Sequence, residues 1–302
     1  MVPAMILCAG RGTRLRPLTD ELPKPLLPVG DRAQLCHVYD RLLRFGATPI
    51  VANTHHLAAH FTARLAMRGP GIHWVREPEL RGTAGGIAGA RELLGSGPVL
   101  VWNGDILADP PLDVLVSRAS RFLAALAIAP RPRGAGTVGI GKHGRVVRLR
   151  GRSFDSEEMG GDYIGVAALS QQAVRELPSS GCLFGDYMLE RLERGGSVAA
   201  VLHRGPWRDI GTPSEYWEAN LAWLGGLTMW AATDARVSPD VTLRRSLIGR
   251  AARVSGSGLM DRVVVWPGAV AEAPLQDAIV TRSAKVLLAA DPLVAESGFT
   301  EG

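Results

Sequence analysis

Short apolar runs alternate with helical patterns from residue 1 to about residue 205. Residues 5–9 and 98–102 have the composition of buried strands, and the second run stops at an Asn-Gly-Asp sequence. Between them, apolar residues recur at helical spacing over 35–43 and end at Gly46, a typical helix C-cap. This alternation predicts an α/β fold with a doubly wound, mainly parallel sheet. In such sheets, ligands bind at the carboxyl ends of the strands.

The pattern changes after about residue 231, where single apolar residues punctuate small and polar ones. Some apolar residues lie six apart, such as Val241 with Leu247 and Ile248 with Val254. This spacing indicates a short hexapeptide-repeat, left-handed β-helix, and the alternative is an irregular β-rich extension. We therefore expect an α/β domain over 1–228 and a β-helix-like tail over 229–302.

Composition narrows the class of protein. Hydrophobic residues make up 46% and charged residues 21%, as in ordinary globular proteins, and no apolar run approaches the roughly 20 residues of a membrane span. Cys8, Cys36 and Cys182 have no CxxC spacing, and the N-terminus has no signal-peptide pattern, so we expect a cytoplasmic protein with reduced thiols. The net charge of +5 comes from scattered arginines, which argues against a nucleic-acid partner.

A glycine-rich loop follows the first predicted strand. The segment reads Leu7-Cys-Ala-Gly-Arg-Gly-Thr-Arg-Leu-Arg-Pro-Leu-Thr19, and Pro23-Lys-Pro-Leu-Leu-Pro-Val29 comes soon after. Glycines let backbone N–H groups approach phosphate oxygens, and Arg14 offers a planar fork of donors. Lys24 stands between two prolines and adds a point charge. These residues predict a phosphate-binding loop, although a lone glycine turn is also typical of a tight βα connection.

The full pattern resembles the sugar-nucleotide pyrophosphorylase family, whose signature is L-A-A-G-x-G-T-R-L-x-P-L-T followed by P-K-P. The resemblance extends through at least residue 224 and implies a Rossmann-like nucleotidyltransferase domain over 1–228. It implies catalytic roles for Arg14 and Lys24. It also implies that the loop contacts substrate through Leu7, Ala9, Gly10, Gly12 and Thr13.

Residues 79–86 read Glu-Leu-Arg-Gly-Thr-Ala-Gly-Gly and are similar to the family's nucleobase loop, E-x-L-G-T-A-G. The resemblance assigns substrate contacts to Glu79, Gly82, Thr83 and Gly85. The alternative is a glycine-rich helix start without a binding role.

Two aspartates are the expected Mg²⁺ ligands. Asn103-Gly104-Asp105 ends a predicted strand, and the matching family aspartate binds Mg²⁺, while Asn103 and Gly104 contact substrate. Mg²⁺ prefers few protein carboxylates together with waters and phosphates, so one aspartate at a strand end suits it. A plain turn is the alternative.

The sequence from Trp207 to Tyr216 is similar to the family's W-x-D-I-G-T-P-x-x-Y. Thr212, Pro213 and Glu215 fit a helix capping box, which leaves Asp209 without a structural duty. The resemblance makes Asp209 the second Mg²⁺ ligand.

Residues 161–166 resemble the strand that lines the family's sugar pocket, with Tyr163 and Gly165 as substrate contacts. Many members carry Glu-Lys-Pro just before this strand, and the lysine holds the sugar phosphate. Here the sequence is Arg148-Leu-Arg-Gly-Arg152, so either an arginine replaces that lysine or the loop is rebuilt.

The resemblance implies an enzyme that joins a sugar 1-phosphate to a nucleoside triphosphate, releases pyrophosphate and uses Mg²⁺. GTP with mannose 1-phosphate is the first expectation for the substrates. The alternatives are uridylyl or guanylyl transfer to N-acetylmuramate, glucose or heptose 1-phosphate. A catalytically silent regulatory subunit is the other class, and homo-oligomerisation through the tail is expected. A tail acyltransferase is disfavoured because the tail shows no obvious acid/base histidine.

Overall fold

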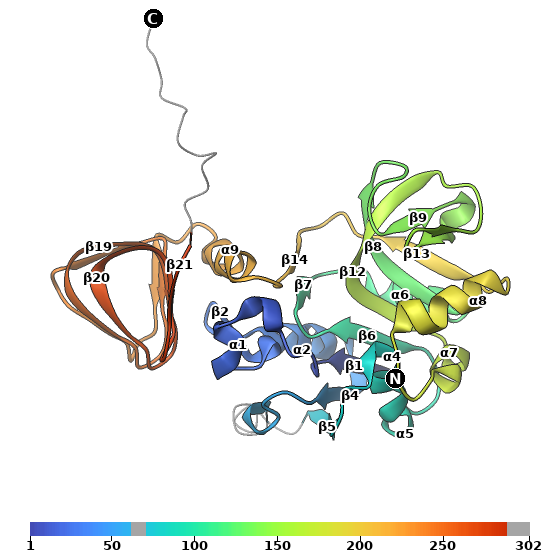
Figure 1. Cartoon of the computed structure of the whole chain (residues 1–302), viewed down its shortest axis with the longest axis horizontal. Helices are drawn as coiled ribbons and strands as arrows, with labels where there is room; N and C mark the ends of the chain where they lie inside the picture. Colours follow the sequence, from blue (N-terminus) through green and yellow to red (C-terminus); the bar gives the residue numbers. More distant parts are fainter. Residues whose placement is uncertain (62–70, 289–302) are drawn as a thin grey trace, which may run out of the picture. The chain divides into compact units, whose positions relative to one another are not determined.

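A computed structural model describes residues 1–61 and 71–288 of the chain (Figure 1). The chain divides into two compact units. The first unit comprises Met1–Thr13, Leu22–Leu27 and Arg32–Ile210, and the second comprises Arg14–Glu21, Pro28–Asp31 and Gly211–Gly302. The expected domain boundary near residue 228 stays a prediction.

The first unit alternates strands with mostly short helices. Its helices are η2 Lys24–Leu26, α2 Gln34–Phe45, α4 Gly82–Gly89, α5 Arg91–Leu94, α6 Leu112–Ala119, η4 Lys142–Gly144, α7 Gln171–Glu176, the π-helix η5 Leu183–Met188 and α8 Leu189–Glu193. Its strands are β1 Val2–Leu7, β3 Arg32–Ala33, β4 Ala47–Thr54, β5 Ile72–Arg76, β6 Val99–Asn103, β7 Ile106–Ala108, β8 Ala124–Arg131, β9 Val138–Ile140, β10 Val146–Leu149, β11 Arg152–Ser153, β12 Met159–Leu169, β13 Val198–Leu202 and β14 Trp207–Asp209.

Ten strands of the first unit form a single sheet with the order β11-β10-β9-β12-β6-β1-β4-β5, and β8 lies between β12 and β13. The pairs β1–β4, β1–β6, β4–β5 and β8–β13 are parallel. Strand β12 is antiparallel to β6, β8 and β9, and β10 is antiparallel to β9 and β11. The α/β class is confirmed, but the expected mainly parallel sheet is mixed, because short hairpins link β9 to β11 without the crossover that a parallel pair needs.

The segment that replaces the Glu-Lys-Pro sequence forms one of these hairpins. Leu149 pairs with Arg152, so the turn consists of Arg150 and Gly151. Their φ angles are 48° and 80°, and two positive φ values are typical of the primed turns that match strand twist. Residues 146–153 thus form a tight β-hairpin.

Apolar side chains fill both faces of the sheet. Along β1, Ala4 and Ile6 join the core under α2 and α6, whereas Met5 joins the core under α4 and α7. Alternation along a strand sends successive side chains to opposite faces, so both faces are covered, as the doubly wound pattern predicts. Helix α2 ends at Gly46 (φ 82°), whose N–H donates to Leu42 and Leu43, which confirms the predicted C-cap.

The second unit combines a helix with a β-rich region. Its 12-residue helix α9 (Pro213–Leu224) begins at Thr212, whose hydroxyl accepts from the N–H of Glu215, while Glu215 accepts from the N–H of Gly211. The first contact confirms Thr212 as the predicted N-cap, and the returning bond of Glu215 goes to the N–H of Gly211, one residue before the N-cap. The other elements are α1 Leu18–Glu21, β2 Pro28–Val29, β15 Met229–Ala231, β16 Arg236–Val237, β17 Val241–Arg244, β18 Ser246–Ile248, β19 Arg253–Val265, β20 Val270–Val280 and β21 Lys285–Leu287.

Strands β15 to β21 form a seven-stranded sheet, which confirms a β-rich tail. Most of its pairs are parallel, and many partners differ by 17 in residue number. Leu247, for example, pairs with Trp230 on one side and with Val264 on the other. Leu247, Ile248 and Val254 are buried, as expected for the apolar positions of a stacked repeat.

Candidate active site

A two-stranded sheet brings Asp105 and Asp209 together in the first unit. Strand β6 ends at Asn103, and Asp105 lies in the turn before β7. Strand β14 pairs antiparallel with β7, with Asp209 opposite Ile106, and the N–H of Ile210 donates to the carbonyl of Asp105 at 3.3 Å. The two carboxylates that the sequence pattern selected, 104 residues apart in the chain, are therefore neighbours.

Lys24 joins these two carboxylates. Its Nζ donates to Asp105 Oδ2 and lies 3.4 Å from Asp209 Oδ1. The lysine belongs to the short helix η2 between two prolines, and the N–H of Leu27 donates to its carbonyl at 3.2 Å. The side chain of Lys24 is only 12% exposed, whereas Asp209 is 47% exposed. The cluster carries a net charge of −1 and presents its carboxylates to solvent.

The donor set suits Mg²⁺ better than a cation held by protein ligands alone. Within residues 1–61 and 71–288, no three His, Cys, Asp or Glu side chains are grouped closely enough to hold a metal ion. Two carboxylates leave most of an octahedral shell to waters and phosphate oxygens, which is the usual arrangement for Mg²⁺ in phosphate chemistry. Asp105 and Asp209 are the residues that fit this role.

Cys8 and Tyr163 flank Asp105 as neutral groups. Burial, and then the negative charge of Asp105, raises the pKa of the Cys8 thiol and of the Tyr163 hydroxyl above their ordinary values. The Tyr163 ring packs on Phe184 with centroids 4.7 Å apart. Both side chains therefore form an uncharged wall beside the carboxylates.

Glycines permit close packing around the cluster. A Cβ on Gly104 would lie 2.8 Å from Cys8 Sγ, and the N–H of Gly104 donates to the Leu7 carbonyl at 2.9 Å. Gly165 has a φ of +78°, and a Cβ there would lie 2.4 Å from Ile106 and 3.1 Å from the amide of Asn103. A larger residue at either position would force Cys8 or Ile106, which flank Asp105 in structure or in sequence, to shift.

The glycine-rich loop is divided between the two units. Ala9 is buried, Gly10 has open space at its Cα, and Gly12 has a φ of +63°. Thr13 is the last residue of this segment of the first unit, whereas Arg14 belongs to the second unit within the short helix η1 (Thr13–Leu15). The guanidinium of Arg14 is exposed and lies beside Gly211, whose added Cβ would be 3.2 Å away.

The predicted nucleobase loop opens helix α4. Gly82 has a φ of +72°, and a Cβ there would lie 2.4 Å from the Gly181 carbonyl, so only glycine fits. The hydroxyl of Thr83 accepts from the N–H of Leu183 at 2.7 Å, which fastens the loop to η5. Gly85 is buried against residues 179–180. Glu79 is exposed, and the buried carboxylate of this region is Glu77, which the motif did not single out.

Arg148, in the segment where many family members carry Glu-Lys-Pro, is bonded within the protein. Its Nε donates to Glu157 at 2.7 Å, and its other nitrogens donate to the carbonyls of Ala135 and Gly136. Hydrogen bonding to Glu157 raises the pKa of Arg148, and the same bond lowers the pKa of Glu157. Arg152 pairs with Glu193. Both arginines attach the hairpin to segments that lie outside it.

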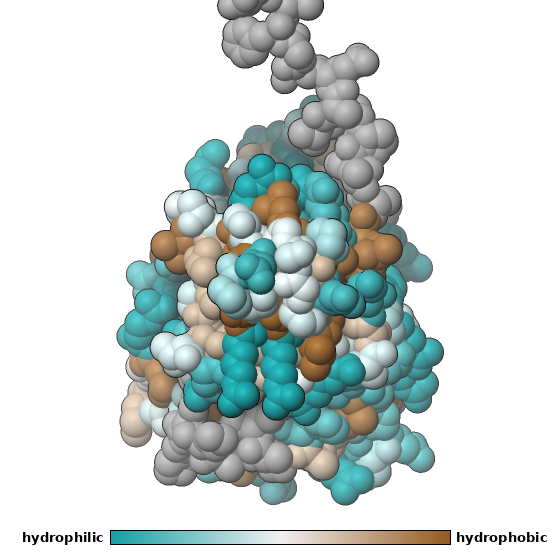
Figure 2. All heavy atoms as spheres, turned by 90° about the vertical axis from the view of Figure 1, so that its left-hand side faces the viewer, coloured by the Kyte–Doolittle hydropathy of each residue, from teal (hydrophilic) through white to brown (hydrophobic). Residues whose placement is uncertain are grey.

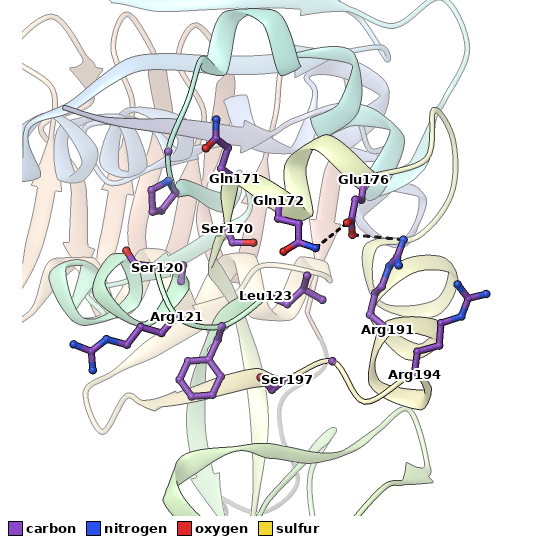
Figure 3. Close-up of a pocket in the computed structure, with 15 residues that line it drawn as sticks. Ser120, Arg121, Leu123, Ser170, Gln171, Gln172, Glu176, Arg191, Arg194 and Ser197 are labelled. Atoms are coloured by element: carbon purple, nitrogen blue, oxygen red, sulfur yellow. Dashed lines mark hydrogen bonds and ion pairs between the residues drawn. The ribbon is translucent and has the colours of Figure 1, made fainter.

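A separate cavity of about 660 Å³ lies at the amino ends of strands, whereas the aspartate cluster lies at a carboxyl end. Its lining includes Pro98 and Ser197, which directly precede β6 and β13, whereas Asp105 follows the carboxyl end of β6. Figure 3 shows Gln172 and Arg191 both joined to Glu176, at 2.9 Å and 3.5 Å. Gln172, Glu176 and Arg191 thus form one connected group in the lining, and the cavity does not include the aspartate cluster.

The comparisons with known proteins agree with this geometry. The nucleotidyl transferase family model matches residues 3–225, so the chain belongs to the nucleotidyl transferase family. The mannose-1-phosphate guanylyltransferase of Mycobacterium tuberculosis is 28% identical over 311 residues, covering 90% of this chain and 82% of the relative. The N-acetylmuramate alpha-1-phosphate uridylyltransferase of Neisseria meningitidis is 44% identical over 121 residues, or 39% of this chain and 52% of that protein.

Among solved structures, HddC from Yersinia pseudotuberculosis complexed with GMP-PN has the same fold. Its TM-score is 0.63 at 20% identity, and the match covers 74% of this chain and all of that one. In the part of the chain that the structure describes, no helix is long and apolar enough to cross a membrane.

Proposed function

We propose that the chain transfers a nucleoside monophosphate from a nucleoside triphosphate to a sugar 1-phosphate. The observation that carries this proposal is the convergence of Asp105 and Asp209 on Lys24 at the carboxyl end of β6. Ligand sites of α/β sheets lie at such strand ends. The family membership and the sugar-1-phosphate transferases among the relatives support the same reaction.

In this reaction an oxygen of the sugar phosphate attacks the α-phosphorus of the triphosphate. A new phosphorus–oxygen bond forms as the α–β bridge breaks, and the bridging electron pair leaves with pyrophosphate. The nucleophile is already an anion, so positioning and charge neutralisation supply the catalysis. Asp105 and Asp209 would hold Mg²⁺, which when bound offsets negative charge on the phosphates. Lys24 steadies the α-phosphate and the sugar phosphate, and Arg14 donates to the leaving phosphates.

GTP and mannose 1-phosphate are the substrates that we propose first, since the mannose-1-phosphate guanylyltransferase matches over 90% of this chain. UTP with N-acetylmuramate 1-phosphate comes second, because that relative has the higher identity over a shorter stretch. A pyrophosphate-release assay over the common nucleoside triphosphates and a panel of sugar 1-phosphates tests both. Triphosphate binding without turnover on any pair would favour a regulatory subunit instead.

We also propose that residues 229–288 wind as a left-handed β-helix, apart from a nucleotidyltransferase domain over 1–228. The 17-residue offset between parallel partners, close to three six-residue steps, supports this coil. Figure 2 shows a face on which hydrophobic and hydrophilic residues are interspersed. Val270 and Leu287 are each 65% exposed in the tail. Such exposed apolar side chains support pairing of the tail with a second copy of the chain. The molar masses of the wild type and of Val270→Lys in solution test this pairing.

A cytoplasmic location fits the three free cysteines.

A further inference from the structure

A chain of hydrogen bonds, here called the relay, joins the carboxyl ends of three adjacent parallel strands, β1, β4 and β5. The N–H of Cys8, just after β1, donates to Asn53 Oδ1 of β4 at 2.8 Å. Asn53 Nδ2 donates to Oε1 of Glu77, just after β5, at 2.7 Å. The N–H of Arg81 donates to Glu77 Oε2 at 3.1 Å. One asparagine and one glutamate thus connect Cys8 to Arg81.

The two ends of this relay are the residues next to the proposed substrate loops. Cys8 immediately precedes Ala9 and Gly10 of the glycine-rich loop, and Arg81 immediately precedes Gly82, where α4 begins. The start of α4 is therefore bonded directly to the Glu77 carboxylate, and the glycine-rich loop is connected to the same carboxylate through Asn53.

The two side chains of the relay are buried, whereas its contact with the N–H of Arg81 is partly buried. Asn53 and Glu77 are each 2% exposed. Gly86 of α4 lies directly over them, since a Cβ there would be 2.6 Å from Asn53 Nδ2 and 2.9 Å from Glu77 Oε1. Buried polar groups that lose a partner cannot turn to water, so each contact of the relay is needed.

The direction of every bond is set by the two backbone donors. The N–H of Cys8 can only donate, so Asn53 must present its oxygen there and its amide nitrogen to Glu77. The N–H of Arg81 can only donate as well, so Glu77 must accept from both sides. An ionised carboxylate is the group that accepts at both oxygens.

We infer that Asn53 and Glu77 are positioning residues that hold the glycine-rich loop and the start of α4 in register for the triphosphate. This inference rests on the proposed function. Neither side chain is a catalytic residue, because both are buried and act through the loops. Placement matters because a misplacement of about 1 Å in a bound substrate can cost about 100-fold in rate.

The arrangement of donors and acceptors in the relay can be tested by substitution. Asn53→Asp sets two carboxylates against each other, and Glu77→Gln places a donor where an acceptor is needed, whichever way its amide turns. The double substitution Asn53→Asp/Glu77→Gln satisfies every contact again, because the new amide donates to the new carboxylate and still accepts from Arg81. Each variant is measured with the full chain.

We expect each single substitution to lower kcat/KM for the triphosphate at least about tenfold, while KM for the sugar 1-phosphate stays within about twofold. The double variant should recover to within about threefold of the wild-type kcat/KM.

Amide hydrogen exchange gives a readout that does not depend on turnover. Exchange over 8–13 and 81–86 should quicken in both single variants and return to the wild-type rate in the double variant. The matched control is Asn220→Asp, another buried asparagine that bonds to backbone groups at Gly30 and Pro28, and it should leave exchange in these segments unchanged.

The inference is overturned if the double variant remains as impaired as the worse single variant. It is also overturned if the single variants lose thermal stability but keep wild-type exchange and triphosphate KM. If a single variant does not fold, the double variant must fold and show wild-type exchange. A wild-type protein that turns over no substrate pair would refute the proposed function, while the exchange data would still test the relay.

Discussion

The two units hold their proposed functional residues in different ways. In the first unit, Lys24, Asp105 and Asp209 are placed by strand ends, two prolines and paired backbone groups of β7 and β14. In the second unit, the end of the segment Arg14–Glu21 is held through one side chain, that of Glu21. The carboxylate of Glu21 accepts hydrogen bonds from Thr281 Oγ1, from both the N–H and the hydroxyl of Ser283, and from the N–H of Arg282.

Substitutions in the first unit should therefore change catalysis, whereas substitutions in the second unit should change how well that unit is ordered. Backbone pairing places the aspartates even when their carboxylates are altered, so changes there should act on catalysis with little effect on folding. The Arg14 segment is bonded to residues 281–283, in the turn between β20 and β21, more than 250 positions later in the chain. Changes in that contact should act first on the order of the second unit.

The largest effect should come from the carboxylates of the first unit. Asp105→Asn and Asp209→Asn should each lower turnover roughly 10²- to 10³-fold, because each removes a charge that would hold Mg²⁺ against the phosphates. Steady-state kinetics at several Mg²⁺ concentrations measure the loss, and circular dichroism measures folding. Asp109→Asn is the matched control, since that exposed carboxylate pairs with Arg41, away from the aspartate cluster. Near-normal activity in either site variant would refute the metal assignment.

Arg14→Ala should come next and should act on the triphosphate. Charge-assisted hydrogen bonds are worth about 1.5–3 kcal/mol, so we expect KM for the triphosphate to rise about 10- to 100-fold. Arg16→Ala tests the neighbouring exposed arginine, whose partner is Asp20 at 3.1 Å, and should leave KM unchanged. Equal effects from the two variants would mean that Arg14 acts only through general charge.

Much of this site could be predicted because its signals are local. Lys24 between prolines, Asp105 after a buried strand, and the Thr212 capping box each depend on a few adjacent residues. Their convergence followed from the rule that ligands bind at strand carboxyl ends. The helix C-cap at Gly46 was predictable for the same local reason.

The features that escaped prediction depend on distant partners. The run from Ile164 to Leu169 has the same apolar composition in a parallel or antiparallel strand, so the direction of β12 could not be read from it. Glu77, next to a proline, has the appearance of an exposed loop residue, and its partner Asn53 is 24 positions away. In the sequence, Arg148 was a candidate to bind phosphate. The structure shows that its side chain is paired with Glu157.

A smaller effect should come from the contact that orders the second unit. Glu21→Ala removes a carboxylate with several donors, and we expect the free energy of unfolding to fall by about 1–3 kcal/mol. KM for the triphosphate should rise less than in Arg14→Ala, since the arginine itself remains. Thermal and urea unfolding measure the change, with exposed Glu272→Ala of β20 as the control. A triphosphate defect as large as that of Arg14→Ala would show that the tail places the arginine.

The smallest expected effect is the pH dependence of this same contact. Burial raises the pKa of Glu21, but hydrogen bonds from Ser283, Thr281 and Arg282 outweigh it, so the pKa lies below the ordinary value of 4.5. A carboxyl with a lowered pKa in the folded state stabilises the fold fully above its unfolded pKa, and this stabilisation is lost as the pH falls through the folded pKa. The stability difference between wild type and Glu21→Gln should therefore be largest at neutral pH and shrink below about pH 4.5. Unfolding midpoints between pH 7 and pH 3 measure it, with Glu272→Gln as the matched variant. A difference that stays constant over that range would mean that the ionised form of Glu21 does not order the second unit.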